Sequence, residues 1–454
     1  MDYLEQIKIR NIIKVLGVTL LGIILGISPI TALVFLLLMV LIFVYWQHEL
    51  SLRLFLFILP FHTLLTSYLI PTYFNIDNTY TSPWRELLVL LLLFKLLVNK
   101  RSKKISLNLL AISIILFVAV ITVSALAGKL SVASLYGFRV YSFPFLIFCT
   151  LYFSPVKSID KLKKTIIISS FIACIYGFLQ IFVFDTRFLL DIGYGKNGYL
   201  DHSFYIAGAE FQRLVGPFGS PNEFGSFLVL IILFTFDFYR KNIKLFYLVI
   251  IIFELIALIY TFSRSAWISL IIASIYYLYK SRLISAKFIF STMYFGVMML
   301  LLVPIFSNKL FERIATHLFN TVTLNEPSSR GHLDSLIDGF YNMLLNPMGF
   351  GLGLSGPRSK SLGTNIINVE NSFILIAYEL GIIGLLLFIA IIYFLIQFIK
   401  KDIYSKNVNM SLVIALIVNF MFLPNIQSLD VVYIFWILIA LNLKVTIKDK
   451  EKYY

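Results

Sequence analysis

Five arginines stand beside apolar stretches of the chain, where positive charge is unusual. They are Arg85, Arg139, Arg213, Arg264 and Arg330. The guanidinium group is a planar fork of N–H donors that matches phosphate oxygens two at a time. A single arginine of this kind can extend to the membrane surface or pair with a carboxylate. Five on one side of a membrane are better explained by a shared anionic ligand, which is what we predict.

The longest polar segment, 307–370, carries Arg330 and ends at Glu370. Apolar residues at helical spacing predict two amphipathic helices within it, over 310–319 and 329–345. We expect both to lie on the outer membrane surface with their apolar sides down, so that the segment forms a lid. After them come glycines that let the backbone approach a ligand closely: Gly349, Gly351 and Gly353.

A second polar segment, 185–221, is rich in glycine and proline, which favours a fixed loop. It ends in residues that are typical of a helix start. Ser220 is the predicted N-cap, Pro221 the first helical residue and Glu223 the third, the position that pairs with the N-cap residue. A helix N-terminus beside Arg213 attracts anions. A capped turn without a ligand is the alternative.

The composition is that of an integral membrane protein. Of 454 residues, 59% are hydrophobic and only 13% are charged, about half the charged share of a soluble protein. Runs of about 20 apolar residues predict an all-α, polytopic domain spanning 1–454, with about fourteen transmembrane helices, or twelve if short runs do not cross. The predicted helices are 11–28, 29–46, 52–70, 83–98, 106–127, 137–153, 164–184, 222–239, 244–262, 265–279, 286–306, 372–399, 409–424 and 429–446.

The basic residues set the orientation. Most of them lie in alternate short loops, which by the positive-inside rule face the cytoplasm together with both termini. The net charge of +15 is therefore a topology signal and a contact with anionic lipid. It is not a nucleic-acid surface. Segments 185–221 and 307–370 then face outward, as do the five arginines.

Several motifs resemble the O-antigen polymerase and O-antigen ligase (Wzy/WaaL-type) family. They are Arg213-x-x-Gly216-x-x-Gly219-Ser220-Pro221-Asn222, Ser263-Arg264-Ser265-Ala266, Arg330, Asn346-Pro347-x-Gly349-x-Gly351-x-Gly353 and Asn371-Ser372-Phe373-x7-Gly381-x-x-Gly384. The match in order and spacing runs from about 205 to 390. Ligases carry a histidine directly before the last motif, where this chain has Glu370. The departure favours a polymerase over a ligase.

The resemblance implies a reaction at the outer face of the cytoplasmic membrane. Such proteins transfer a glycan from undecaprenyl pyrophosphate to an acceptor hydroxyl, without a nucleotide sugar, metal or other cofactor. A polymerase uses a second lipid-linked repeat unit as acceptor. Expected partners are these donor and acceptor lipids, membrane lipids, and a chain-length regulator and flippase of the same pathway. The product would be a capsular, exo- or O-antigen polysaccharide of the cell envelope.

Roles for individual residues follow from this chemistry. Arg213 and Arg264 would hold the leaving pyrophosphate as its charge develops. Glu370 is our hypothesis for the base that takes the acceptor proton. Other candidates for the base are Glu86, His332, Asp334 and Asp338. Substrate-binding roles are predicted for Arg139, Arg330, Asn222, Arg85 and Asn371. In the predicted helix 372–399, we expect Glu379 to pair with an arginine, and Gly381 and Gly384 to allow close helix packing.

A flippase of lipid-linked oligosaccharide is the rival from another class. It would show two related halves and polar residues leading to the cytoplasmic side. The sequence has no related halves, and its unusual polar residues lie on one face, which favours the enzyme. The sugars, their linkage and the oligomeric state do not follow from the sequence.

Overall fold

The computed structural model describes residues 48–76, 81–98, 109–154, 156, 158–184, 186–194, 204–205, 212–285, 327–356 and 369–450. Its elements are α3 (His48–Ile58), η1 (Leu59–Phe61), η2 (Leu64–Leu69), α4 (Ile70–Phe74), α6 (Trp84–Val98), α7 (Leu109–Ala127), α8 (Val132–Phe153), α9 (Ile159–Phe182), α10 (Thr186–Asp191), α11 (Pro221–Lys241), α12 (Leu245–Tyr260), α13 (Arg264–Lys280), α16 (Pro327–Leu345), α17 (Ser372–Lys400), α18 (Lys406–Phe422), η6 (Asn425–Gln427) and α19 (Leu429–Lys450). These ranges contain no strand, only an isolated bridge between Tyr205 and Gln212. The all-α prediction is confirmed for this part of the chain.

The predicted spans within these ranges coincide with helices to within a few residues. One span differs in shape, because 52–70 was predicted as a single straight helix. The structure instead has two helical pieces, Glu49–Phe61 and Leu64–Phe74, bent by 63°. Pro60, at the start of η1, cannot donate a backbone hydrogen bond and disturbs the helix there.

Five of the described helices are long and apolar enough to cross a membrane, or six if the bent pair counts as one crossing. Helices α12 and α18 are apolar but shorter. This part of the chain is a multi-pass membrane bundle, while the total of about fourteen spans stays a prediction. The predicted helices 11–28, 29–46, 286–306 and 310–319 lie outside the described residues.

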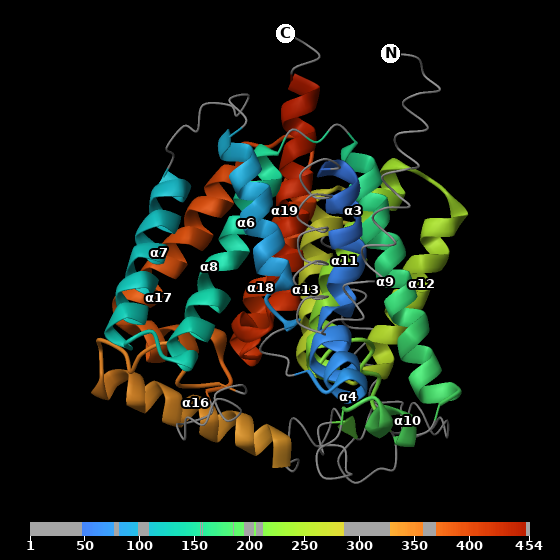
Figure 1. Ribbon diagram of the computed structural model, residues 1–454. Helices are drawn as coiled ribbons and strands as arrows, with labels where there is room; N and C mark the ends of the chain where they lie inside the picture. Colours follow the sequence, from blue (N-terminus) through green and yellow to red (C-terminus); the bar gives the residue numbers. More distant parts are fainter. Residues whose placement is uncertain are drawn as a thin grey trace, which may run out of the picture.

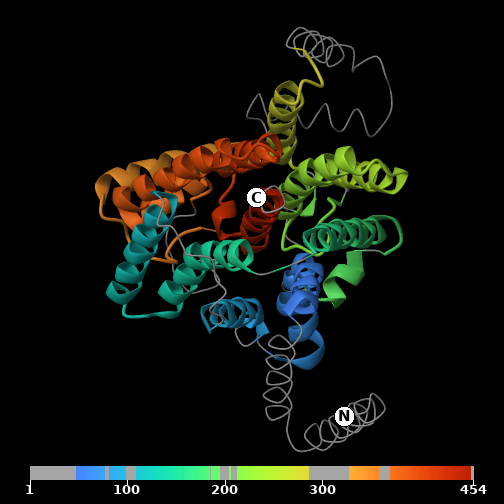
Figure 2. The ribbon, with the colours of Figure 1, turned by 90° about the horizontal axis from the view of Figure 1, so that it is seen from above.

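Helix α19 occupies the centre of the bundle, with the other helices around it (Figure 2). Every side chain from Leu429 to Leu443 is buried. Among these side chains, Trp436 packs edge-on against Phe145 and Phe148 of α8. The central position of α19 does not follow from its residues, because a helix surrounded by helices and a helix facing lipid are both apolar on all sides.

Helix α16 lies crosswise at one end of the bundle, at the same end as α10 (Figure 1). It confirms the predicted helix 329–345, with two more residues at its start. Gly339 packs against Val369 and Ile374, so the small side chains of α16 face the start of α17. The predicted apolar stripe lies on the opposite side and is exposed: Leu333, Leu336, Ile337, Phe340 and Leu344. Its contact with the membrane surface, and the lid 307–370, stay predictions.

Helix α17 is broken at Gly381, whose φ of 71° and ψ of −178° are not helical. Residues 347–356, which we call the glycine loop, fill the break. The loop replaces helical hydrogen bonds with its own: Phe350 N–H to Tyr378 O (2.7 Å), Gly351 N–H to Glu379 O (3.1 Å) and Ile382 N–H to Pro347 O (2.9 Å). The prediction that Gly381 serves helix packing is wrong, because its positive φ and the adjoining loop backbone require glycine there.

Candidate functional site

Arg213 lies where a loop meets the start of α11. Its Nη2 donates to Asn222 Oδ1 and its Nε to Thr261 O, both at 2.8 Å. Ser220 Oγ accepts from Glu223 N–H at 3.2 Å, and Glu223 Oε2 accepts from Gly219 N–H at 3.2 Å. The predicted cap is therefore confirmed, and it fixes Asn222 beside the guanidinium group.

The loop between Arg213 and α11 is held by buried hydrogen bonds to the backbone of Gly216. Gln180 makes two hydrogen bonds to the backbone of Gly216, one through its Oε1 (2.9 Å) and one through its Nε2 (3.0 Å). Tyr194 donates to the same carbonyl at 3.0 Å. Burial raises the pKa of the Tyr194 hydroxyl well above its ordinary value, so the hydroxyl stays protonated as a donor. These three hydrogen bonds hold the loop next to Arg213 in one conformation.

Arg264 is the first residue of α13 and comes close in the fold to Arg213. Thr261, whose carbonyl binds Arg213, lies three residues before it. Phe262 between them has a φ of 49°, which turns the chain from α12 into α13. The Arg213 side chain therefore lies at the start of α11 and beside the turn that leads into α13, three residues before Arg264. Because helix N-termini carry partial positive charge, the place is doubly suited to an anion.

The turn before α19, residues 423–430, connects the surrounding elements and was missed by the sequence analysis. Its hydrogen bonds are Asn425 Nδ2 to Ser226 Oγ (2.6 Å), Ile426 N–H to Ser372 Oγ (3.2 Å), Gln427 Nε2 to Ser355 O (2.7 Å) and Ser428 Oγ to Glu223 Oε1 (2.7 Å). The turn thus joins α11, α17 and the glycine loop. A signal was present, since the polar residues Asn425, Gln427, Ser428 and Asp430 follow Pro424 between two apolar runs.

Arg85 and Arg139 form a second cluster with two carboxylates. Arg85 binds Glu86 Oε1 at 3.1 Å and also binds Asp430, and its guanidinium lies 5.0 Å from the Tyr433 ring. Only 2% of the Arg85 side chain is exposed. Arg85 is therefore paired with carboxylates, which is one of the two possibilities given above for such an arginine. A substrate-binding role for Arg85 remains a prediction. Arg139 shares Glu86 Oε1 at 2.8 Å but is 20% exposed.

Glu370 and Asn371 precede α17, beside α16. The backbone N–H of Glu370 donates to Ser335 Oγ at 3.0 Å, and its side chain is half-buried. Asn371 Oδ1 caps α17 by accepting from two N–H groups, and its Nδ2 donates to Met421 O at 2.7 Å. Through this bond the start of α17 is tied to the end of α18. Neither the base role of Glu370 nor substrate binding by Asn371 is tested by these contacts.

The other predicted residues are spread over the same end. Arg330 belongs to the first part of α16, and its side chain and that of His332 lie outside the described residues. Asp334 and Asp338 are exposed on α16. Glu379 does not pair with an arginine in the described part. Its Oε1 instead accepts from Ser355 N–H of the glycine loop at 3.3 Å.

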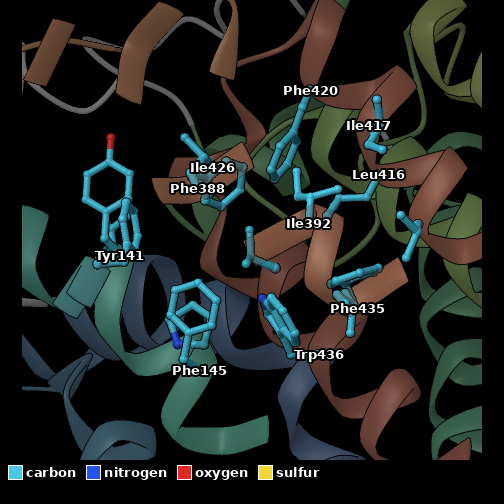
Figure 3. A pocket seen from close by; sticks show the side chains of 16 residues that line it. Tyr141, Phe145, Phe388, Ile392, Leu416, Ile417, Phe420, Ile426, Phe435 and Trp436 are labelled. Atoms are coloured by element: carbon cyan, nitrogen blue, oxygen red, sulfur yellow. The ribbon is translucent and has the colours of Figure 1, made fainter. Parts of the chain in front are cut away.

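An apolar cavity of about 20 Å³ lies inside the bundle between α7, α8, α17, α18 and α19 (Figure 3). Its walls include Phe145, Phe388, Phe420 and Trp436. A space of this size has room for about one water molecule, and an apolar one stays dry. It is a packing defect of the apolar core. Within the described residues, His, Cys, Asp and Glu side chains do not gather in threes as around a metal ion.

Two comparisons place these features among known proteins. A family model described as O-antigen ligase matches residues 246–389, which include α12, α13, α16, the glycine loop and the first part of α17. The chain is also 31% identical over 203 residues to an O-antigen polymerase of Salmonella muenchen. That match covers 43% of this chain and 48% of the relative, so about half of the relative's length is matched. Both matches confirm the resemblance found in the motifs.

Proposed function

We propose that the chain polymerises oligosaccharide repeat units carried on undecaprenyl pyrophosphate, on the premise that residues 246–389, which match a family model described as O-antigen ligase, share that family's chemistry. The reaction takes place at the outer face of the cytoplasmic membrane, at the bundle end that carries α16. The products are long polysaccharide chains of the cell surface.

The observation that carries this proposal is the contact of Arg213 with Thr261, three residues before Arg264, beside the starts of α11 and α13. Asn222 and Thr261 hold the Arg213 guanidinium in one orientation. Arg264 supplies a second guanidinium group, and the N-termini of α11 and α13 add partial positive charge. A fixed positive site of this kind stabilises a pyrophosphate as it leaves.

The proposed step is a glycosyl transfer. The bond between the anomeric carbon of the donor glycan and the pyrophosphate oxygen breaks, and undecaprenyl pyrophosphate leaves with the electron pair. A hydroxyl oxygen of the acceptor unit forms the new bond to that carbon. Glu370 takes the hydroxyl proton, while Arg213 and Arg264 bind the leaving group. Arg330, Asn222 and Asn371 position the two substrates.

One residue, Glu370, favours a polymerase over a ligase. The family's ligases carry a histidine where this chain has Glu370, and a carboxylate there suits a different acceptor. The relative from Salmonella muenchen, which is an O-antigen polymerase by name, supports the same choice. Transfer to another acceptor by a ligase is the second candidate.

Deletion of the gene tests the proposal. Lipid-linked glycans are then extracted from the membrane and sized, with the wild-type gene returned on a plasmid as the control. We expect single repeat units to accumulate on the lipid at the outer face and long chains to disappear. Long chains that persist on lipid would indicate a ligase. Units trapped at the cytoplasmic face would indicate a flippase and end the polymerase proposal.

A further inference from the structure

Arg139 is held by three hydrogen bonds at the outer part of α8. Its Nε donates to Glu86 Oε1 at 2.8 Å, its Nη1 to Ser82 Oγ at 3.0 Å and its Nη2 to Ser82 O at 3.0 Å. A guanidinium group has five N–H donors. Two of them, one on each terminal nitrogen, therefore have no partner in the described part of the chain. Since 20% of the side chain is exposed, they are available to a ligand.

The charges around Arg139 cancel. Arg85 and Arg139 contribute +2, and Glu86 and Asp430 contribute −2, and the four side chains are linked by ion pairs. The formal charges of these four side chains therefore sum to zero. A pyrophosphate bound at Arg139 would meet two carboxylates that repel it. A neutral hydroxyl group meets no such penalty and gains a charge-assisted hydrogen bond.

The position of Arg139 also suits the glycan. Gly137, two residues before Arg139 in α8, packs against Leu352 and Gly353 of the glycine loop. The turn before α19 joins the two clusters, because Ser428 binds Glu223 beside Arg213 and Asp430 binds Arg85. A donor whose pyrophosphate lies at Arg213 can therefore extend its sugars toward Arg139 on the same end of the bundle.

We propose that Arg139, with the Ser82 hydroxyl, binds hydroxyl groups of the glycan and contributes to sugar specificity, while Arg213 and Arg264 bind the pyrophosphate. Glu86 is a positioning residue, because its carboxylate orients Arg139 and is itself buried. This inference rests on the proposed function and assigns a different part of the same substrate to each arginine cluster.

The test compares two ligands for purified protein in lipid nanodiscs. One is the lipid-linked repeat unit extracted from the deletion strain, and the other is undecaprenyl pyrophosphate without sugar. For Arg139→Gln we expect the affinity for the repeat unit to fall about 10- to 100-fold, the usual effect of one lost charge-assisted hydrogen bond. Affinity for the sugar-free lipid should change by less than about 2-fold. Arg213→Gln is the matched variant and should weaken both ligands.

Ser82→Ala and Glu86→Gln extend the test without removing the arginine. Each should raise KM for the repeat unit and leave kcat nearly unchanged, because binding and not the chemical step is affected. Equal weakening of both ligands by Arg139→Gln would place the pyrophosphate at Arg139 and overturn the inference. So would unchanged binding of both ligands. If wild-type protein binds neither ligand, the proposed function itself fails.

Discussion

Ser428 Oγ donates a 2.7 Å hydrogen bond to Glu223 Oε1, across 205 residues of sequence. Through it, the turn that starts the central helix α19 holds the first turn of α11. Glu223 in turn accepts from Gly219 N–H and follows Asn222, the partner of Arg213. The orientation of the predicted pyrophosphate site thus depends on a serine near the far end of the described chain.

Ser428→Ala should lower both stability and activity. Loss of the donor leaves a half-buried carboxylate oxygen with one partner fewer, at a cost of about 1–3 kcal/mol. Thermal unfolding in detergent and the rate of polymer formation measure the two effects. Thr122→Ala is the control, because the Thr122 hydroxyl is exposed and bonds only to its own helix. A Ser428→Ala protein as stable as Thr122→Ala would contradict the role given to this bond.

Arg213→Ala and Arg264→Ala should each abolish long chains, with a loss of about 100-fold or more in rate. Lysine at either position should restore a part of the activity, because it keeps the charge but not the fork. Arg240→Ala, at the opposite end of α11, is the control and should retain activity. The measurement is the size distribution of surface polysaccharide, with membrane levels of each variant checked by immunoblot. Normal chains from both alanine variants would disprove the anion site.

Glu370→Gln should remove the proton acceptor and keep the size of the side chain. We expect a loss of about 10²- to 10⁴-fold in kcat, the usual contribution of a general base. Asp338→Asn, on the exposed surface of α16, should have little effect. Polymer formation from purified lipid-linked units gives the rates. Full activity of Glu370→Gln rules the residue out as the base.

Gly381→Ala should destabilise the protein. A Cβ atom there would lie 2.6 Å from Met348 C and Pro347 O, both of which are backbone atoms, at a φ of +71°. Strain of this kind costs about 1–3 kcal/mol. Gly331→Ala on α16 is the matched control, because nothing lies within 4 Å of its Cβ position. That change should be neutral or gain about 0.5–1 kcal/mol from helix propensity. Equal melting temperatures for the two variants would argue against the break in α17.

Arg85→Ala should destabilise the protein more than any surface change. The buried carboxylates of Glu86 and Asp430 would lose a shared cation, which costs about 3–5 kcal/mol for a broken buried pair. Lys241→Ala breaks the pair with Asp237, but Lys241 is 48% exposed. Its effect should stay below about 1 kcal/mol. The comparison is made by thermal unfolding, and a mild effect of Arg85→Ala would show that the cluster is not a structural element.

Local signals in the sequence predicted the helices and the cap of α11. Ser220 was identified because a cap needs only a few neighbouring residues of the right type. The pairing of Arg85 with Asp430 was not predicted, since it depends on the first turns of α6 and α19 lying at the same end of the bundle. The break at Gly381 was missed for a similar reason. A glycine in an apolar run is compatible with close helix packing and with a break in the helix. Only the contacts of the glycine loop with α17 show that Gly381 marks a break.

The central place of α19 bears on how the protein is made. Every other described helix precedes α19 in the chain, so the membrane-spanning helices around it are synthesised before the helix that they will surround. Until α19 is made, Arg85 has no Asp430, and Glu223 has no Ser428. These polar groups gain those partners only when α19 takes its central position.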